Sequence, residues 1–259
     1  MSKVGIVVAI VVLAGRIWAS DTAGVPGSTR PAAHESTPLP ASARQLLVVR
    51  SASWTATTGT LQRYARDPDK PWKPVAVATD VNVGRRGMAW GRGLHAPQDT
   101  GPMKKEGDQK SPAGAFLLGQ AFGYDDGLPE GAHGYPYLHI AASTSCIEDA
   151  NSHYYNQVID PATVSRADWS ERDSMRRPDG LFRWGIVVAH NAGEPERGAG
   201  SCIFLHIWRG LGKGTAGCTA MPQEFVEELV RWLEPGSHPV LVQLPEAQYE
   251  RLRSSWVLP

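Results

Sequence analysis

The sequence predicts a mostly β fold with few helices. Short β-branched or alternating runs recur along the chain, and turn residues separate them, a pattern typical of strands joined by ordered loops. Glycine (27) and proline (20) are plentiful, whereas long stretches of helical periodicity are scarce. With 259 residues, 42% of them hydrophobic, the chain is long enough to bury the core of one large domain.

The first 43 residues are expected to precede the folded domain. Residues 1–20 combine Lys3, a short apolar run and Ala19 at a plausible cleavage position, which is typical of an export signal; an uncleaved membrane anchor is the alternative. Residues 21–43 are rich in Pro, Ser, Thr, Ala and Gly and lack apolar periodicity, so we expect a flexible linker. The protein is therefore expected to be exported to the periplasm or cell envelope.

Residues 44–245 are predicted to form the domain, and residues 246–259 a C-terminal tail. Strands are expected at 46–50, 60–66, 74–81, 115–120, 185–190, 202–208 and 239–244. One helix is expected within 222–236, where Pro222 suits a first helical position and Pro235 ends the pattern. Its apolar stripe consists of Val226, Leu229, Val230 and Leu233.

The charge balance and the cysteines narrow the function classes. The 26 basic and 26 acidic residues cancel, so nothing suggests a nucleic-acid or anionic membrane surface. In an oxidising compartment, two of the three cysteines can pair. We favour Cys146 with Cys202, which leaves Cys218 as a free thiol; three unpaired, buried cysteines are the alternative.

The segment GLGKGTAG (210–217) superficially resembles a phosphate-binding loop. Its glycine spacing matches the dinucleotide fingerprint, but the expected helix starts too late and no βαβ unit can follow so near the C-terminus. A P-loop would need GK[ST] where this chain has GKG. No nucleotide cofactor is therefore expected.

The same loop can instead bring a histidine and a cysteine together. Strand alternation places Phe204, His206 and Trp208 on one face, and the loop returns the chain to Cys218 just before a helix. A protonated imidazole beside the thiol would stabilise a thiolate nucleophile. The backbone amides around Gly217 and Cys218 could form an oxyanion hole. A histidine in an apolar strand can also be purely structural.

His206 followed by TAGC (215–218) resembles the signature of the L,D-transpeptidase (YkuD-like) family, a histidine, a spacer and then [S/T]-H-G-C. The resemblance extends to the branch of that family that contains EGDxxSPAGxF, over roughly residues 85–222. Ordered blocks at consistent spacing are far more specific than one short pattern. The blocks are GMAWGRG (87–93), KKEGDQKSPAGAFLLGQAFGY (104–124), CIEDANSHYYNQVID (146–160), WSERDSM (169–175), GIVVAHN (185–191) and GSCIFLHIW (200–208).

The resemblance implies a β-sandwich with Cys218 as the nucleophile and His206 as the general base, oriented by a backbone carbonyl. It implies attack on the diaminopimelate–D-Ala bond of peptidoglycan tetrapeptide stems, without a cofactor. The thioester would then pass to an amine of a second stem, giving a 3→3 cross-link, or to water, giving L,D-carboxypeptidation.

Two departures from the family pattern support an alternative. Ala216 and Ala220 stand where the family commonly has a histidine and an arginine. The alternative is a catalytically silent peptidoglycan-binding protein of the same fold.

Other polar residues are candidates for contacts with the substrate. The predicted set is Thr215, Asn191, Glu106, Asp108 and Trp208. Turn-forming or packing roles are the alternatives for these residues. A zinc site built from Cys202, His206, Cys218 and His190 is a further alternative, but no metallopeptidase signature supports it and no metal is expected.

Overall fold

The computed structural model describes residues 37–259, so the expected signal peptide and most of the expected linker lie outside the described residues. Within the described part, no helix has the length and apolarity needed to span a membrane.

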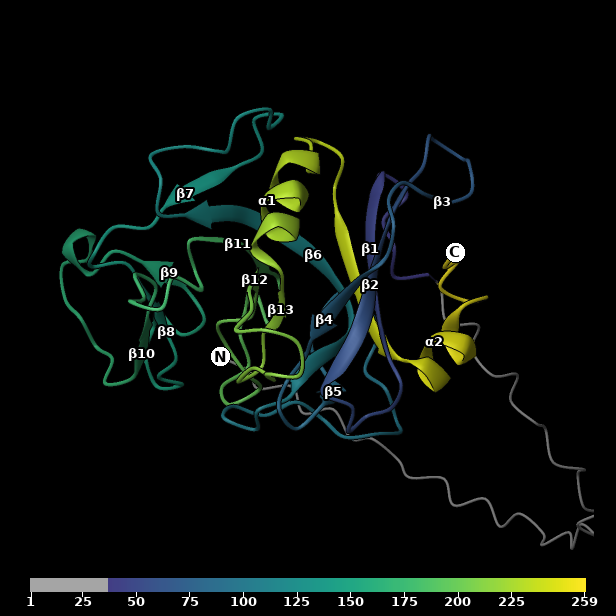
Figure 1. Cartoon of the computed structure of the whole chain (residues 1–259). Helices are drawn as coiled ribbons and strands as arrows, with labels where there is room; N and C mark the ends of the chain where they lie inside the picture. Colours follow the sequence, from purple (N-terminus) through teal and green to yellow (C-terminus); the bar gives the residue numbers. More distant parts are fainter. Residues whose placement is uncertain (1–36) are drawn as a thin grey trace, which may run out of the picture. The chain divides into compact units, whose positions relative to one another are not determined.

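One 11-stranded sheet makes up most of the domain (Figure 1). Its strands follow the order β1 (Gln45–Ser51), β14 (Val240–Pro245), β6 (Ser111–Gly123), β11 (Trp184–Val188), β12 (Phe204–Ile207), β13 (Thr219–Met221), β4 (Thr79–Asn82), β2 (Thr58–Ala65) and β3 (Lys73–Pro74), while β5 (Met88–Trp90) and β7 (Tyr137–His139) pair with β6. Because β1 also pairs with β2, the sheet closes on itself and its opposing halves face one another across a shared core. The predicted mostly β class with few helices is confirmed.

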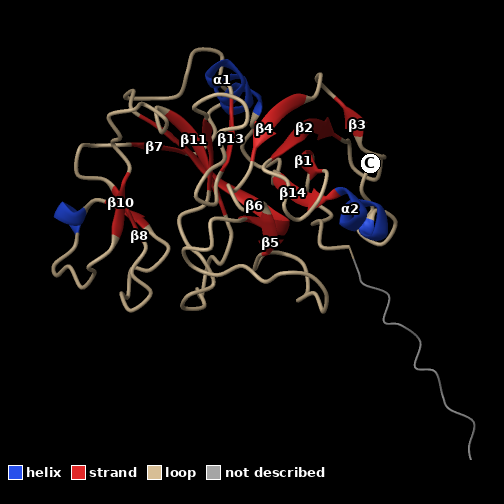
Figure 2. Ribbon diagram, turned by 60° about the horizontal axis from the view of Figure 1, so that its bottom comes forward, coloured by secondary structure: helices blue, strands red, loops and turns tan. Residues whose placement is uncertain are grey.

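A second, small sheet lies beside the main one (Figure 2). It contains β10 (Arg172–Ser174), β8 (Ser145–Ile147) and β9 (Val158–Ile159), followed by the one-turn 3-10 helix η1 (Pro161–Thr163). We call residues 145–174 the insertion sheet segment, because it leaves the main sheet after β7 and returns before β11.

The sequences of the central strands are continuous apolar runs. Such runs suit strands whose two faces are both buried. All six residues of β14 are buried, as are six of the seven in β1. These strands run parallel to each other, an arrangement that is found where both faces of a sheet are covered. Strands are present at five of the predicted positions, 46–50, 60–66, 115–120, 185–190 and 239–244, and β6 extends well beyond its predicted limits.

Two strand predictions need correction. Residues 75–78 do not join the sheet, and Val77 is 87% exposed, because the chain leaves the edge strand β3 there. The predicted strand at 202–208 starts only at Phe204, because Cys202 has a left-handed backbone conformation with φ of +56°.

The α-helices of the described residues, α1 and α2, lie near the C-terminal end of the chain. Helix α1 (Gln223–Trp232) follows Pro222 and buries Phe225, Val226, Leu229 and Val230. Residues 246–259, expected as a tail, instead contain helix α2 (Glu246–Leu252), and Trp256 beyond it is 1% exposed. This C-terminal segment therefore packs against the domain and contributes to its core.

Candidate active site

The glycine-rich loop connects two parallel neighbours, β12 and β13. In their register His206 lies opposite Ala220, and Leu205 lies opposite Thr219. A parallel pair needs a connection that carries the chain back to the end from which it started. Cys218, directly before β13, is therefore returned to the start of β12, beside Phe204.

Asn82 holds this loop in place. Its side-chain amide donates to the Gly210 carbonyl at 2.8 Å, and its carbonyl oxygen accepts from the Gly212 amide at 2.8 Å. Gly210 and Gly212 have φ values of +116° and +79°, which other residues rarely adopt. The two glycines thus allow the turn that returns the chain to Cys218. No helix begins where a dinucleotide-binding fold requires one, directly after the loop.

The free thiol of Cys218 is held by the backbone of the neighbouring strand. Its Sγ lies 3.4 Å from the Phe204 amide, which donates to it, and 3.5 Å from the Cys202 carbonyl, which accepts from it. The Cys218 carbonyl accepts from the hydroxyls of Ser111, at 2.9 Å, and of Thr215, at 2.5 Å. The residue is therefore fixed at both its side chain and its backbone.

His206 is buried on the same face as Cys218. Its Nδ1 lies 2.7 Å from the Ile207 carbonyl oxygen. Since a carbonyl can only accept, Nδ1 carries the proton and Nε2 is left as a base. The ring packs edge-on against Phe182, with centroids 5.0 Å apart. Within residues 37–259, Nε2 of His206 has no hydrogen-bond partner.

Burial favours the neutral form of both groups. It lowers the pKa of His206 to about 4, against a smaller opposing effect of the Ile207 carbonyl. It raises the pKa of the Cys218 thiol to about 12, although the Phe204 amide acts in the opposite direction. Both shifts favour a neutral thiol beside a neutral base over the expected thiolate beside a protonated imidazole.

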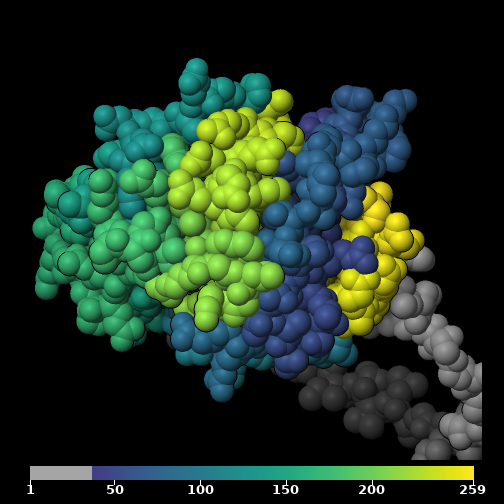
Figure 3. All heavy atoms as spheres, viewed as in Figure 1, coloured from purple at the N-terminus to yellow at the C-terminus, as the bar shows by residue number. Residues whose placement is uncertain are grey.

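His206 and Cys218 line the same cavity, which has a volume of about 260 Å³. Its other walls include Arg85, Asp173 of the insertion sheet segment, the loop 209–216, and the chain between the insertion sheet segment and β11 through Arg177, Leu181 and Phe182. On the face shown in Figure 3, the yellow-green loop and helix α1 lie between the green insertion and the blue N-terminal strands. The cavity thus brings a free thiol and a histidine with an available ring nitrogen together.

Comparison with known proteins identifies the family. The family model of the L,D-transpeptidase catalytic domain matches residues 57–242. This chain belongs to the L,D-transpeptidase family. A transpeptidase-type enzyme acting on peptidoglycan follows from that membership. No curated protein matches the chain.

Two of the predicted substrate-contacting residues line the cavity that contains His206 and Cys218, namely Thr215 and Trp208. Thr215 is also part of a local turn, since its Oγ1 accepts from the Gly217 amide at 3.1 Å. The Gly217 amide, predicted as an oxyanion donor, is thus engaged in this state. A Cβ at Gly217 would meet Ile203 at 3.2 Å, so a glycine suits this close approach.

The other three predicted residues do not line the cavity. Asn191 is 2% exposed and binds the backbone of Glu196 and Gly200. The Glu106 carboxylate accepts from Tyr155 and Ser201, and Asp108 pairs with the buried Lys104 at 2.6 Å. Each of these polar groups already has partners in the fold.

Several residues of the candidate site were not predicted from the sequence. Asn82 and Ser111 each contact the loop that ends at Cys218, and two further residues line the cavity: Asp173 from the insertion sheet segment and Arg177 from the turn that follows it. Asn82 and Ser111 are both fully buried polar residues, but only their three-dimensional partners reveal that property.

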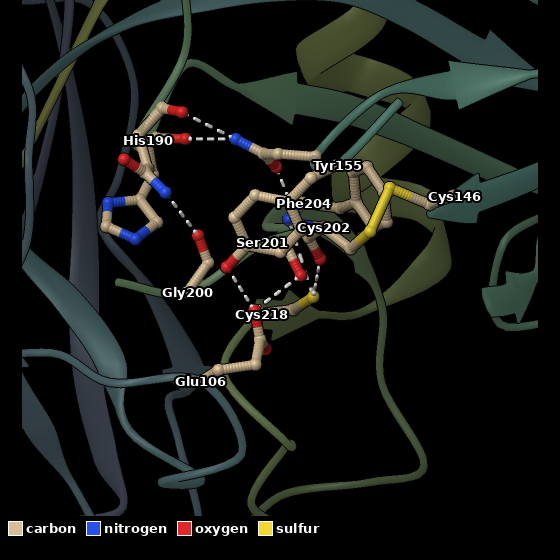
Figure 4. The surroundings of a disulfide bond; sticks show 11 residues. Glu106, Cys146, Tyr155, His190, Gly200, Ser201, Cys202, Phe204 and Cys218 are labelled. Carbon is tan, nitrogen blue, oxygen red and sulfur yellow. Dashed lines mark hydrogen bonds between the residues drawn. A yellow bond between two sulfur atoms is a disulfide. The ribbon is translucent and has the colours of Figure 1, made fainter. Parts of the chain in front are cut away.

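The two remaining cysteines form a disulfide, Cys146–Cys202 (Figure 4). It joins β8 of the insertion sheet segment to the residue that precedes the His206 strand by two positions. Because its sulfur is in a disulfide, Cys202 is not available as a ligand for the alternative zinc site. Among the described residues, no group of three or more His, Cys, Asp and Glu side chains is placed to hold a metal ion.

Proposed function

We propose that this protein is a peptidoglycan L,D-transpeptidase in which Cys218 is the nucleophile and His206 the general base. The observation that carries the proposal is the shared cavity, in which a free thiol and an imidazole with an available Nε2 meet. A neutral thiol beside a neutral histidine suits general-base catalysis, because the proton moves only as the carbon–sulfur bond forms.

The donor is a tetrapeptide stem, cleaved between diaminopimelate and D-Ala. The Cys218 sulfur attacks the amide carbonyl, and its proton passes to Nε2 of His206. The amide bond breaks, the D-Ala nitrogen takes the proton from His206, and a thioester remains on Cys218. An amine of a second stem then displaces the thiol and gives a 3→3 cross-link, whereas water gives carboxypeptidation.

The backbone amide of Cys218 is the first candidate to stabilise the oxyanion, since the Gly217 amide must first leave Thr215. Four cationic residues line the cavity and only one acidic residue does: Arg85, Arg177, Arg209 and Lys213 against Asp173. Asp179 pairs with both Arg177 and Arg209. This net positive lining suits a stem peptide that carries several carboxylates.

The test is mass spectrometry of the mature protein incubated with a disaccharide-tetrapeptide, beside a Cys218→Ala control. A tripeptide product or a 3→3 dimer, absent from the control, is expected, and their ratio separates carboxypeptidase from transpeptidase activity. Absence of both products and of any adduct on Cys218 would contradict the proposal.

A further inference from the structure

Two backbone groups that hydrogen-bond to the Cys218 sulfur belong to the short segment that begins at Cys202 (Figure 4). The Cys202 carbonyl accepts from the thiol, and the Phe204 amide donates to the sulfur. A thiol held between one acceptor and one donor has a defined rotamer. The path of the backbone at residues 202–204 therefore sets the direction of the nucleophile.

That backbone is strained at Cys202. Its φ of +56° is one that a side chain with a Cβ rarely adopts. Such a conformation persists only where the surroundings hold it. Released from its contacts, Cys202 would return to an extended conformation, and its carbonyl would turn away from Cys218.

Two contacts hold Cys202 in place. Its sulfur is bonded to Cys146 on β8, and its amide donates to Oδ1 of Asn156 at 2.9 Å. The Asn156 side chain is fixed in turn, because its Nδ2 donates to the carbonyls of His190 and Asn191 at 2.9 and 2.8 Å. Cys202 is thus held at its side chain by the disulfide and at its backbone by the hydrogen bond to Asn156.

We propose that the Cys146–Cys202 disulfide and Asn156 are positioning elements for the Cys218 thiol. They act on the rate of acyl transfer through the Cys202 carbonyl and the Phe204 amide. The proposal rests on the proposed role of Cys218 as the nucleophile.

The disulfide has a second effect that Asn156 lacks. Cys146 lies directly opposite Asp173 in the β8–β10 pair, and Asp173 lines the cavity. Loss of the disulfide therefore releases a cavity wall as well as the thiol, whereas loss of the Asn156 side chain affects the thiol. Loss of Asn156 should therefore change kcat alone, whereas loss of the disulfide should change both kcat and KM.

The experiment compares Asn156→Gly with the double variant Cys146→Ser/Cys202→Ser, using the disaccharide-tetrapeptide as substrate and iodoacetamide as a probe of Cys218. Asn156 has a φ of +64°, so glycine keeps the backbone unstrained and removes only the amide. We expect Asn156→Gly to lower kcat and to change the alkylation rate of Cys218 by about tenfold or more with KM unchanged. The double serine variant should lower kcat and also raise KM.

Two matched variants test the mechanism. Cys146→Ser/Cys202→Gly lacks the disulfide, but its glycine adopts a positive φ freely, so kcat should recover towards that of the intact chain. Asn151→Gly makes the same exchange at an exposed position of the insertion sheet segment and should leave kcat unchanged.

An unchanged kcat and an unchanged alkylation rate in folded Asn156→Gly would overturn the proposal. That variant decides the matter if the double serine variant fails to fold, because it retains the disulfide. Failure of the proposed function is recognised separately, since the intact chain would then form no acyl adduct. The alkylation rates would still report how the thiol is held.

Discussion

His206 and His190 are both buried histidines, but their ring nitrogens are engaged differently. Both are buried, at 7% and 1% exposure, and burial lowers the pKa of each to about 4. In His190 both ring nitrogens are occupied, because Nε2 lies 3.1 Å from the Ala199 carbonyl and Nδ1 accepts from the Arg92 amide at 3.2 Å. In His206 only Nδ1 is occupied. The free Nε2 of His206, and not its burial, is what makes it a candidate base, whereas the bonded Nε2 of His190 indicates a structural role.

The largest expected effect is on catalysis at His206. His206→Ala should lower kcat/KM for the tetrapeptide by about 10²- to 10⁴-fold, because the base that accepts the Cys218 proton is removed. Steady-state kinetics measures this loss, with circular dichroism to show that the fold is retained. Activity within threefold of the unaltered chain would remove His206 from the mechanism.

His190 should behave in the opposite way. His190→Ala leaves the Arg92 amide and the Ala199 carbonyl unpaired and opens a cavity beside Phe116, so the free energy of unfolding should fall by about 3 kcal/mol. Urea denaturation gives this value. Turnover per folded molecule should stay close to that of the unaltered chain. A selective loss of kcat would contradict a purely structural role for His190.

Both histidines make stability depend on pH. Because each folded pKa, about 4, lies below the ordinary value of 6.5, the unfolded chain binds the proton first as the pH falls. Stability from these groups is full above pH 6.5 and is lost towards pH 4, by on the order of 3 kcal/mol per histidine. Thermal unfolding from pH 7 to 4 should show this loss, and His190→Gln should reduce its slope. A melting temperature that does not change over this range would contradict the burial argument.

The smallest expected effect concerns Glu148, whose pH dependence runs in the opposite direction. Burial, followed by the neighbouring Asp173, raises its pKa from 4.5 to about 7. Its folded form favours the proton, so stability is full below pH 4.5 and is lost as the pH rises through 7. Glu148→Gln should therefore stabilise the protein at pH 8 by on the order of 1–2 kcal/mol after solvent screening, with little change at pH 4. Denaturation midpoints at the two pH values check this, and equal shifts at both would disprove it.

Local patterns in the sequence predicted much of the fold. The buried strands β1 and β14 stood out because continuous apolar runs are covered on both faces, and α1 because its stripe has a helical period. Residues 75–78 misled the strand prediction, since Val75 and Val77 alternate like a strand but are exposed. The packing of Trp256 was missed, because a short segment beyond the last strand gives no signal of its long-range contacts.

The candidate site was predicted only where its residues are close in the chain. His206, Thr215, Trp208 and Cys218 lie within one segment and line one cavity. Asn191, Glu106 and Asp108 have the residue types of a binding site, but their partners are backbone groups and neighbouring side chains that no pattern reveals. Asn82 and Asp173 reach the site through pairing between distant strands.

The most direct test of the central claim, a neutral Cys218–His206 pair, is the rate at which the tetrapeptide acylates Cys218 between pH 6 and 9. Rapid quenching and intact-protein mass spectrometry follow the thioester, with Cys218→Ala as the blank. Since both pKa values lie outside this window, at about 4 and about 12, we expect a rate that does not vary with pH. A rate that rises about tenfold per pH unit would indicate a free thiolate as the reacting species and would contradict the account.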